Sequence, residues 1–226
     1  MRYSLASMWR RARNPRRREV VFRPIVVPST KASDLYASVY APVIRIWTEA
    51  ATAILAEYER SLAEITTDAA PDIGARIDMV ERDLLSVLVT LRGRIGEWSR
   101  IVESWHRRAW KQRVLSATGI DLGTMLGPGD VRTTLEAVIE RNVGLVKSVS
   151  AEARTRIGES VYRGLRERKP AREVAKEIRE ATGMARRRAL RIAAHQNTAL
   201  ASELQDERRR QAGIETWEWV HSDKTN

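Results

Sequence analysis

Residues 72–117 read DIGARIDMVERDLLSVLVTLRGRIGEWSRIVESWHRRAWKQRVLSA, and this stretch decides the fold class. Its apolar residues recur every three or four positions, which is the spacing of one face of an α-helix. The members of this stripe are Ile73, Ile77, Val80, Leu84, Leu88, Leu91, Ile95, Trp98, Val102 and Trp105. An unbroken helix of this length would extend on the order of 65 Å at about 1.5 Å per residue. The stripe therefore predicts a long helix suited to a spacer or scaffold.

A second stripe with the same spacing precedes the first one and begins after Asp34. Its members are Val43, Ile44, Trp47, Ala51, Ile54, Leu55, Tyr58, Leu62 and Ile65. The sequence TTDAAPD at residues 66–72 interrupts the pattern and is typical of a turn. Two long helices joined by a short turn form an antiparallel hairpin. We therefore expect a helical hairpin over residues 34–118, with Trp98 and Trp105 packed in its core rather than exposed for stacking on nucleotides.

The stretch ATGIDLGTMLGPGD at residues 117–130 is the best candidate for a domain boundary, because it holds four glycines and one proline. We place a linker at residues 119–129. Asp130 is suited to cap the next helix, whose apolar residues continue at helical spacing as far as Leu165. Residues 130–226 are thus expected to form a second helical domain.

The second domain is expected to end in a strand. Pro170 favours the start of a short helix that ends near Gly183, and a last helix would then reach Gly213, a typical stop signal. The residues that follow, IETWEWV at 214–220, are of types that favour a strand. A lone strand leaves its amides and carbonyls unpaired. We expect its partner strands to lie in a C-terminal part absent from this chain, or in another chain.

The N-terminal residues 1–33 carry most of the excess positive charge. They hold nine basic side chains against one acid, a local balance of +8 within a net charge of +11 for 226 residues. Three prolines and the lack of a sustained period predict an extended arm. The arm is either a solvated tail or a segment that becomes ordered on an acidic protein surface or on DNA. Its candidate binding residues are Arg10, Arg11, Arg13, Arg16, Arg17 and Arg18, with Trp9 and Phe22 as apolar anchors. The predicted fold class is therefore mainly α, with this arm, the hairpin, and a second helical domain ending in a short β-strand.

Composition excludes several kinds of site. The chain has no cysteine and three scattered histidines, which excludes disulfides and thiolate metal sites, and we expect no metal and no cofactor. No apolar run reaches the roughly 18 residues that a membrane helix requires. The N-terminus is charged where a signal peptide would be apolar. We therefore expect a soluble, unexported protein with no membrane partner.

An enzyme is not expected. His195, Gln196, Asn197, Glu203 and Glu207 share one predicted helix. The sequence nevertheless lacks a zinc-protease motif, a glycine-rich phosphate loop and a nucleophile elbow. Catalysis needs convergent groups that this pattern does not provide.

Three groups of residues near the end of the chain form an ordered pattern. They are Val174, Ala175 and Ile178, then Ala189, Ile192, Ala193 and Thr198, and then Gly213, Ile214, Trp217 and Asp223. Two helical patterns followed by a glycine and a tryptophan-bearing strand resemble the phage head morphogenesis family, the minor head proteins similar to protein F of phage Mu. The resemblance covers about 95 residues, from Asp130 onward. Members often have an arginine-threonine-glutamate triplet where this chain has residues 195–197, and they usually continue into a further strand-rich segment.

The resemblance implies a structural protein of the phage head rather than an enzyme. Such a protein would be present in several copies per particle, in the capsid interior at the portal vertex, and in the host cytoplasm during assembly. It would act in head assembly and in DNA packaging or delivery. The implied partners are the portal protein, the DNA backbone, and the major capsid or scaffolding protein.

The basic run ARRRALR at residues 185–191 suggests a second function class. Its candidate phosphate contacts are Arg186, Arg187, Arg188 and Arg191. Consecutive helical positions point in different directions, so these side chains cannot all face one groove. This run and the ERRR run ending at Arg210 are each either a solvated helix face or a set of contacts to backbone phosphates. A free-standing, non-sequence-specific nucleic-acid-binding helical protein is the alternative to a phage head protein.

Overall fold

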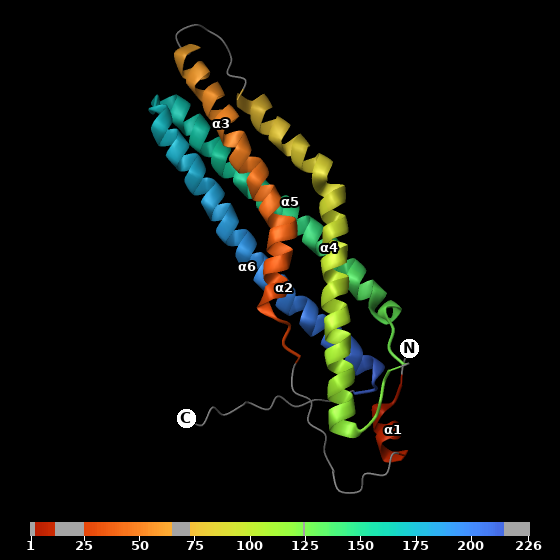
Figure 1. The fold of residues 1–226 in the computed structure, drawn as a ribbon. Coiled ribbons are helices and arrows are strands. Elements are labelled where there is room, and N and C mark those ends of the chain that lie inside the picture. Colours follow the sequence, from red (N-terminus) through yellow and green to blue (C-terminus); the bar gives the residue numbers. More distant parts are fainter. Residues whose placement is uncertain (1–2, 12–24, 65–72, 124, 215–226) are drawn as a thin grey trace, which may run out of the picture.

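The computed structural model describes residues 3–11, 25–64, 73–123 and 125–214, most of which lie in helices (Figure 1). The α-helices are α1 (Leu5–Arg11), α2 (Ser29–Leu35), α3 (Ala41–Glu64), α4 (Ile73–Thr118), α5 (Arg132–Glu167) and α6 (Ala171–Gln211). A π-helical turn, η1 (Tyr36–Tyr40), joins α2 to α3, and a 3₁₀ turn, η2 (Pro128–Val131), precedes α5. The mainly helical fold is confirmed, and no strand occurs within the described ranges. The predicted strand at 214–220 lies outside them except for Ile214.

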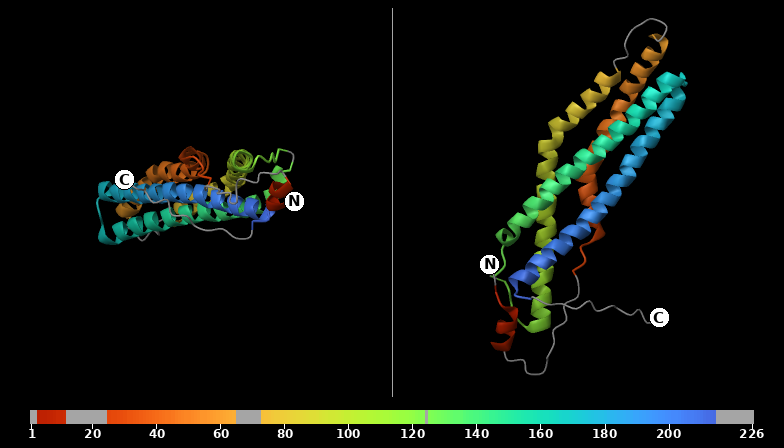
Figure 2. Two further views of the ribbon diagram at one scale, coloured as in Figure 1. Left: turned by 90° about the horizontal axis from the view of Figure 1, so that it is seen from below. Right: turned by 180° about the vertical axis from the view of Figure 1, so that it is seen from behind.

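The four long helices form an elongated bundle in two layers. Seen from below, α3 and α4 lie in one layer and α5 and α6 lie in the other (Figure 2). Helix α4 has 46 residues, which confirms the single long helix that its apolar stripe predicts, and it is visibly bent in Figure 1. The connection between α3 and α4 at residues 65–72 is outside the described ranges. Both α3 and α4 contact α5 and α6, so the four helices pack on one another.

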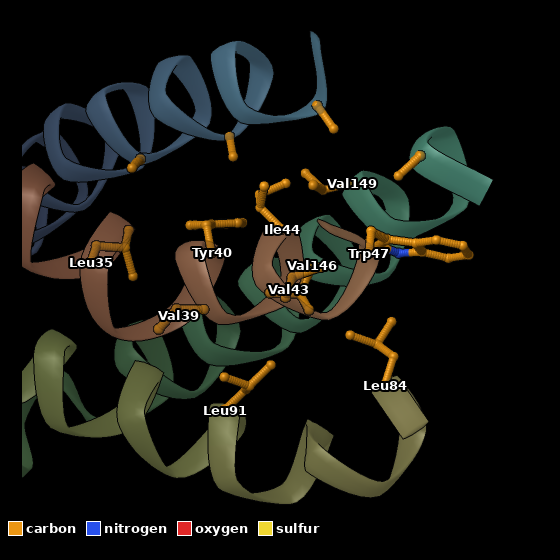
Figure 3. Close-up of a cluster of buried hydrophobic side chains, with 14 of the residues drawn as sticks. Leu35, Val39, Tyr40, Val43, Ile44, Trp47, Leu84, Leu91, Val146 and Val149 are labelled. Carbon is orange, nitrogen blue, oxygen red and sulfur yellow. The ribbon is translucent and has the colours of Figure 1, made fainter. Parts of the chain in front are cut away.

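A large cluster of buried apolar side chains, the main cluster, holds this bundle together. It takes residues from η1, α3, α4, α5 and α6, and Figure 3 shows part of it. In that view Leu84 and Leu91 of α4 point toward the segment that carries Val39 and Trp47. The main cluster therefore includes residues on both sides of the sequence boundary at 119–129, which here connects two helices of the same core.

Helix α6 corrects the expected break at Gly183. It runs without interruption from Ala171 to Gln211, and Pro170 immediately precedes it. Ala181, Ala185 and Ala189 are buried at intervals of four residues across the glycine. Because their packing spans the glycine, tertiary contacts outweigh its low helix propensity. At the other end the prediction holds: Gly213 has φ +68°, the left-handed conformation of a helix stop.

The N-terminal segment also differs from the expected extended arm. Residues 5–11 form α1, and residues 29–33 belong to α2. The amides of Tyr3 and Leu5 donate hydrogen bonds to the carbonyls of Gln211 (2.7 Å) and Ala212 (3.0 Å) at the end of α6. Further along, the amide of Ile25 donates to Gln205 Oε1 (3.0 Å). The parts of the arm that are described are therefore docked on α6, because their buried apolar side chains and main-chain hydrogen bonds offset the cost of ordering them.

A smaller buried cluster, the second cluster, lies beneath this N-terminal segment. It consists of Tyr3, Leu5, Ile25, Trp110, Val114, Ile120, Leu122, Leu126 and Ala212. These residues come from the N-terminal segment, the end of α4, the 119–127 connection and the end of α6. The second cluster thus closes the end of the bundle at which both α4 and α6 terminate.

Candidate nucleic-acid interface

Many arginines of this cationic chain are offset by carboxylates on neighbouring helices. Arg154 of α5 pairs with Asp78 (2.6 Å) and Glu81 (3.1 Å) of α4. Arg141 of α5 likewise pairs with Glu203 of α6 at 2.8 Å. Exposed pairs of this kind add little stability, but they do neutralise the local charge. Cations without such partners are therefore the better candidates for binding an external anion.

The outer side of α6 carries a group of cations without such partners, which we call the α6 basic face. It consists of Arg172, Lys176, Arg179, Arg186, Arg187 and Arg191, all exposed. None of the six forms an ion pair with a described residue, whereas two exposed acids, Glu173 and Glu180, lie beside them. At about 100° per residue, the six cations fall within an arc of about 140° and span about 29 Å along the axis.

The α6 basic face depends on the uninterrupted helix. A break at Gly183 would have separated Arg172, Lys176 and Arg179 from the arginines that follow, and the sequence prediction missed these three. The signal that would have found them is the helical phase, since positions 172, 176, 179, 186 and 187 share one side of a continuous helix.

Two arginines that the sequence analysis places on the surface instead form contacts within the fold. Arg188 donates to the carbonyl oxygen and Oγ of Ser148 (3.0 and 2.9 Å) and pairs with Glu152 (3.0 Å). It therefore holds α6 to α5 and does not belong to the α6 basic face. Arg208, the first arginine of the ERRR run, is fully buried, which corrects both interpretations of this residue, as part of a solvated face and as a phosphate contact.

Arg208 is the centre of a buried polar layer between the main and second clusters. Its Nη2 donates to Glu103 Oε1 (2.8 Å), and its Nη1 donates to Gln211 Oε1 (2.9 Å). Gln211 Nε2 in turn donates to the carbonyl oxygen of Asp130 (2.9 Å), which ties η2 to α6. A hydrogen bond from the Gly127 amide lowers the pKa of the Asp130 carboxyl. The polar layer therefore joins α4, η2 and α6 through one guanidinium.

His106 lies in the same polar layer without a hydrogen bond. The side chain is 1 % exposed, and neither ring nitrogen has a hydrogen-bond partner among the described residues. Burial, together with the charges of Arg208 and Arg113, lowers the pKa of the imidazole to about 4. The ring is therefore neutral at physiological pH. A buried donor or acceptor without a hydrogen-bond partner lowers the stability of the folded chain, so His106 is an unfavourable residue within the polar layer.

The predicted partner-binding residues of the arm fall in different places. Arg10 and Arg11 are exposed at the end of α1. Trp9 is half-buried and packs against the second cluster, so part of its side chain contacts this chain itself. The remaining ones, Arg13, Arg16, Arg17, Arg18 and Phe22, lie outside the described ranges.

The polar residues considered for catalysis do not converge. His195 is exposed, whereas Gln196 and Asn197 are buried. Gln196 accepts a hydrogen bond from Arg141 Nε (2.9 Å), and Asn197 donates one to the carbonyl of Pro28 (3.3 Å). These side chains join elements of the fold. Within the described ranges no group of three His, Asp or Glu side chains is placed to hold a metal ion.

Among the described helices there is no apolar stretch of the length that a bilayer-spanning segment requires. Comparisons with protein-family models, with curated proteins and with solved structures found no match. The α6 basic face is thus the candidate site that the described part of the chain supports best, and its chemistry is that of a surface for polyanions.

Proposed function

We propose that this chain is a structural minor head protein of a tailed phage, acting in head assembly and in DNA packaging or delivery at the portal vertex. The proposal starts from the resemblance of residues 130–226 to the phage head morphogenesis family. It places the protein in the capsid interior of the virion, and in the host cytoplasm during assembly. The portal protein is its main proposed partner, with the major capsid or scaffolding protein as a further one.

The observation that carries this proposal is where α6 places the apolar residues on which the resemblance to the family rests. Val174, Ile178, Ala189 and Ala193 are all buried in the main cluster. These residues therefore build the seam by which α6 packs on the rest of the bundle. A pattern made of seam residues supports a structural role, since it specifies how helices pack rather than how a reaction proceeds.

The charge distribution supports a place beside DNA. The α6 basic face and the arginines of residues 10–18 are both rich in guanidinium groups, which bind phosphates with a planar fork of donors. Neither group includes a recognised motif for reading bases. The proposed contact is therefore to the DNA backbone and independent of sequence.

The same surface supports the second candidate, a free-standing nucleic-acid-binding helical protein. The two candidates differ in their response to salt. Binding to phosphates weakens steeply as salt rises, by about 10³ to 10⁵ between roughly 50 and 200 mM for six to ten contacts. A specific protein interface loses much less over this range, because its apolar core is not screened.

The test is a salt titration of the full chain against purified portal rings of the same phage and against a DNA duplex. The proposed function predicts that the portal complex survives salt that dissociates the duplex complex. Loss of both complexes over the same salt range would favour the free-standing nucleic-acid-binding protein.

A six-alanine variant of Arg10, Arg11, Arg13, Arg16, Arg17 and Arg18 separates the two proposed targets of the arm. If the arm contacts DNA, the salt slope of duplex binding should fall by about 5, at roughly 0.9 per phosphate contact. If the arm contacts the portal, the variant should lose the portal and keep duplex binding through the α6 basic face. Unchanged binding to both targets would mean that the arm is a solvated tail.

A further inference from the structure

Helix α6 continues through Gly183, and the α6 basic face has a hollow at this residue. A Cβ added at this glycine would lie 3.7 Å from Arg187 Nη1, an ordinary contact distance. At Gly164 of α5, by contrast, a Cβ would lie 2.7 Å from Val174 Cγ2, so the close approach of α5 and α6 requires glycine there. Packing within the chain therefore gives no reason for a glycine at position 183, which is otherwise a poor residue for a helix interior.

The hollow at Gly183 is lined mainly by cations. It has a volume of about 450 Å³, and its lining residues are Lys176, Arg179, Glu180, Gly183, Met184 and Arg187. Three of these side chains are cationic and one is a carboxylate. None of the three cations forms an ion pair with a described residue, whereas Arg163 of α5, at a neighbouring site, is held by Glu177 at 2.6 Å. The hollow thus combines space for a small anion with unneutralised donors on both sides of the glycine.

We propose that the hollow at Gly183 is a phosphate-binding site, in which Lys176, Arg179 and Arg187 surround one phosphate of a nucleic-acid backbone. Arg172, Arg186 and Arg191 extend the contact to phosphates on either side of it. This proposal rests on the proposed function only for the source of the phosphate, which is packaged DNA. Arg188 takes no part in the site, because it is held by Ser148 and Glu152.

The side chains of α6 also indicate which form of nucleic acid binds. Helix α6 contains no phenylalanine, tyrosine or tryptophan. Binding of a single strand relies on aromatic side chains that stack on the bases, whereas binding of a duplex backbone relies on charge. The absence of aromatic side chains from α6 therefore favours duplex DNA over a single strand.

The first test compares two charge-removing variants of the full chain. One carries Lys176→Gln, Arg179→Gln and Arg187→Gln, and the matched control carries Arg45→Gln, Arg82→Gln and Arg100→Gln, which are exposed on α3 and α4 without a described ion pair. Binding to a fluorescent duplex is measured over a range of salt. Loss of three phosphate contacts should lower the salt slope by about 2.7 and weaken binding about 10² to 10³-fold near 0.1 M salt. Equal losses in the control would overturn the proposal, since net charge alone would then explain the effect.

The second test fills the hollow without changing charge. Gly183→Leu should fill the space between the cations, weaken duplex binding about 5 to 10-fold and lower the salt slope by about 1, the value of one contact. Gly183→Ala is the control: it adds only a methyl group and should keep wild-type binding while raising the melting temperature. Wild-type affinity of Gly183→Leu would refute the site, and so would a preference of the wild type for a single strand of the same sequence.

The two proposals fail in different ways. A chain that binds portal rings but shows no difference between the two triple variants on duplex DNA would keep the proposed function and lose the phosphate site. A chain that shows the expected difference on DNA but never binds portal rings would keep the site and lose the head-protein function.

Discussion

The main and second clusters both take residues from α4 and from α6 or its C-terminal cap, Ala212, but they differ in the other segments that complete them. The main cluster takes buried residues from every long helix, and most of its members are aliphatic. The second cluster has nine buried members, and three of them, Tyr3, Leu5 and Ile25, precede α2 in the chain. The polar layer around Arg208 lies where the two clusters meet, and Trp105 is an apolar side chain that packs against both of them.

This difference indicates that the two ends of α4 and α6 have different stabilities. The main cluster is closed by helices of 24 to 46 residues, whereas α1, above the second cluster, has only seven. A short segment held by a few main-chain hydrogen bonds opens locally at lower free energy than the core of a bundle. We therefore expect the N-terminal segment to detach while the four-helix core stays folded.

Matched tryptophan substitutions test this difference most directly. Trp47 of the main cluster donates to Ser150 Oγ (2.8 Å), and Trp110 of the second cluster donates to the Tyr3 hydroxyl (3.2 Å). Trp47→Ala should lower the free energy of global unfolding by about 3–5 kcal/mol. Trp110→Ala should cost less than half of this globally and should instead abolish hydrogen-exchange protection of the Tyr3 and Leu5 amides. Equal global losses in urea unfolding would show that the two clusters unfold as one unit.

Removing one member of the buried ion pair between Glu103 and Arg208 should lower the free energy of unfolding by a comparable amount. The loss should depend on which member is removed. Glu103→Met leaves Arg208 buried with Asp130 at 4.0 Å as its nearest carboxylate, and a guanidinium cannot neutralise itself. This substitution should cost about 3–5 kcal/mol. Arg208→Met should cost less, because Glu103 keeps Arg107 at 3.4 Å.

The double variant Glu103→Met with Arg208→Met is the control for that pair. Two apolar side chains of similar volume leave no buried charge uncompensated, and stability should return to within about 1 kcal/mol of the wild type. A double variant as unstable as Glu103→Met would contradict the view that the cost comes from an uncompensated charge. Urea unfolding of the three variants under one set of conditions makes the comparison.

The contrast between the clusters also explains how far the sequence could predict the fold. The stripe from Ile73 to Trp105 predicts α4 because apolar residues that recur every three or four positions over this length fit an α-helix and not a strand. Leu88, at the centre of that stripe, is only half-buried, whereas Leu91 and Ile95 are buried. The docking of the N-terminal segment could not be predicted, since it depends on contacts between residues about 200 positions apart, such as Tyr3 and Gln211.

The candidate site was also predictable only in part, because local sequence shows the charges of α6 but not which of its sides is buried. Arg186, Arg187 and Arg191 were identified from the basic run at residues 185–191, and all three are exposed. A run of arginines does not by itself separate them from Arg188 and Arg208, because burial depends on which side of α6 faces α5 and α4. Local propensity at Gly183 predicted a helix end, whereas the buried alanines on either side of it keep the helix continuous.

Lowering the pH should weaken the polar layer through His106. Its pKa is about 4 in the folded chain against 6.5 for an unperturbed histidine, so the unfolded chain binds the proton more tightly. The stability contributed by the neutral ring is complete above pH 6.5 and is lost as pH falls from there toward 4, by about 3 kcal/mol in total. His106→Leu should remove this part of the pH dependence and should not lower stability at pH 7, because it deletes two unpaired nitrogens.

The measurement is urea unfolding of the wild type and His106→Leu at several pH values between 7 and 4. Carboxylates titrate in both proteins, so the difference between the two curves isolates His106. A constant difference across this range would contradict a depressed pKa. A second variant, Arg208→Met, should raise the pKa of His106, since the charge of Arg208 contributes to lowering it.

The smallest predicted effect comes from the hydroxyl that anchors the N-terminal segment. Tyr3→Phe removes the acceptor for Trp110 Nε1 while keeping the buried ring. The loss should be about 1 kcal/mol, the usual net contribution of one hydrogen bond. If the second cluster opens on its own, this loss should appear as about fivefold faster exchange of the Leu5 amide, with no change in the global unfolding midpoint. A shift of the global midpoint without faster exchange at Leu5 would mean that the N-terminal segment is a cooperative part of the bundle, and the distinction between the two clusters would then be one of composition alone.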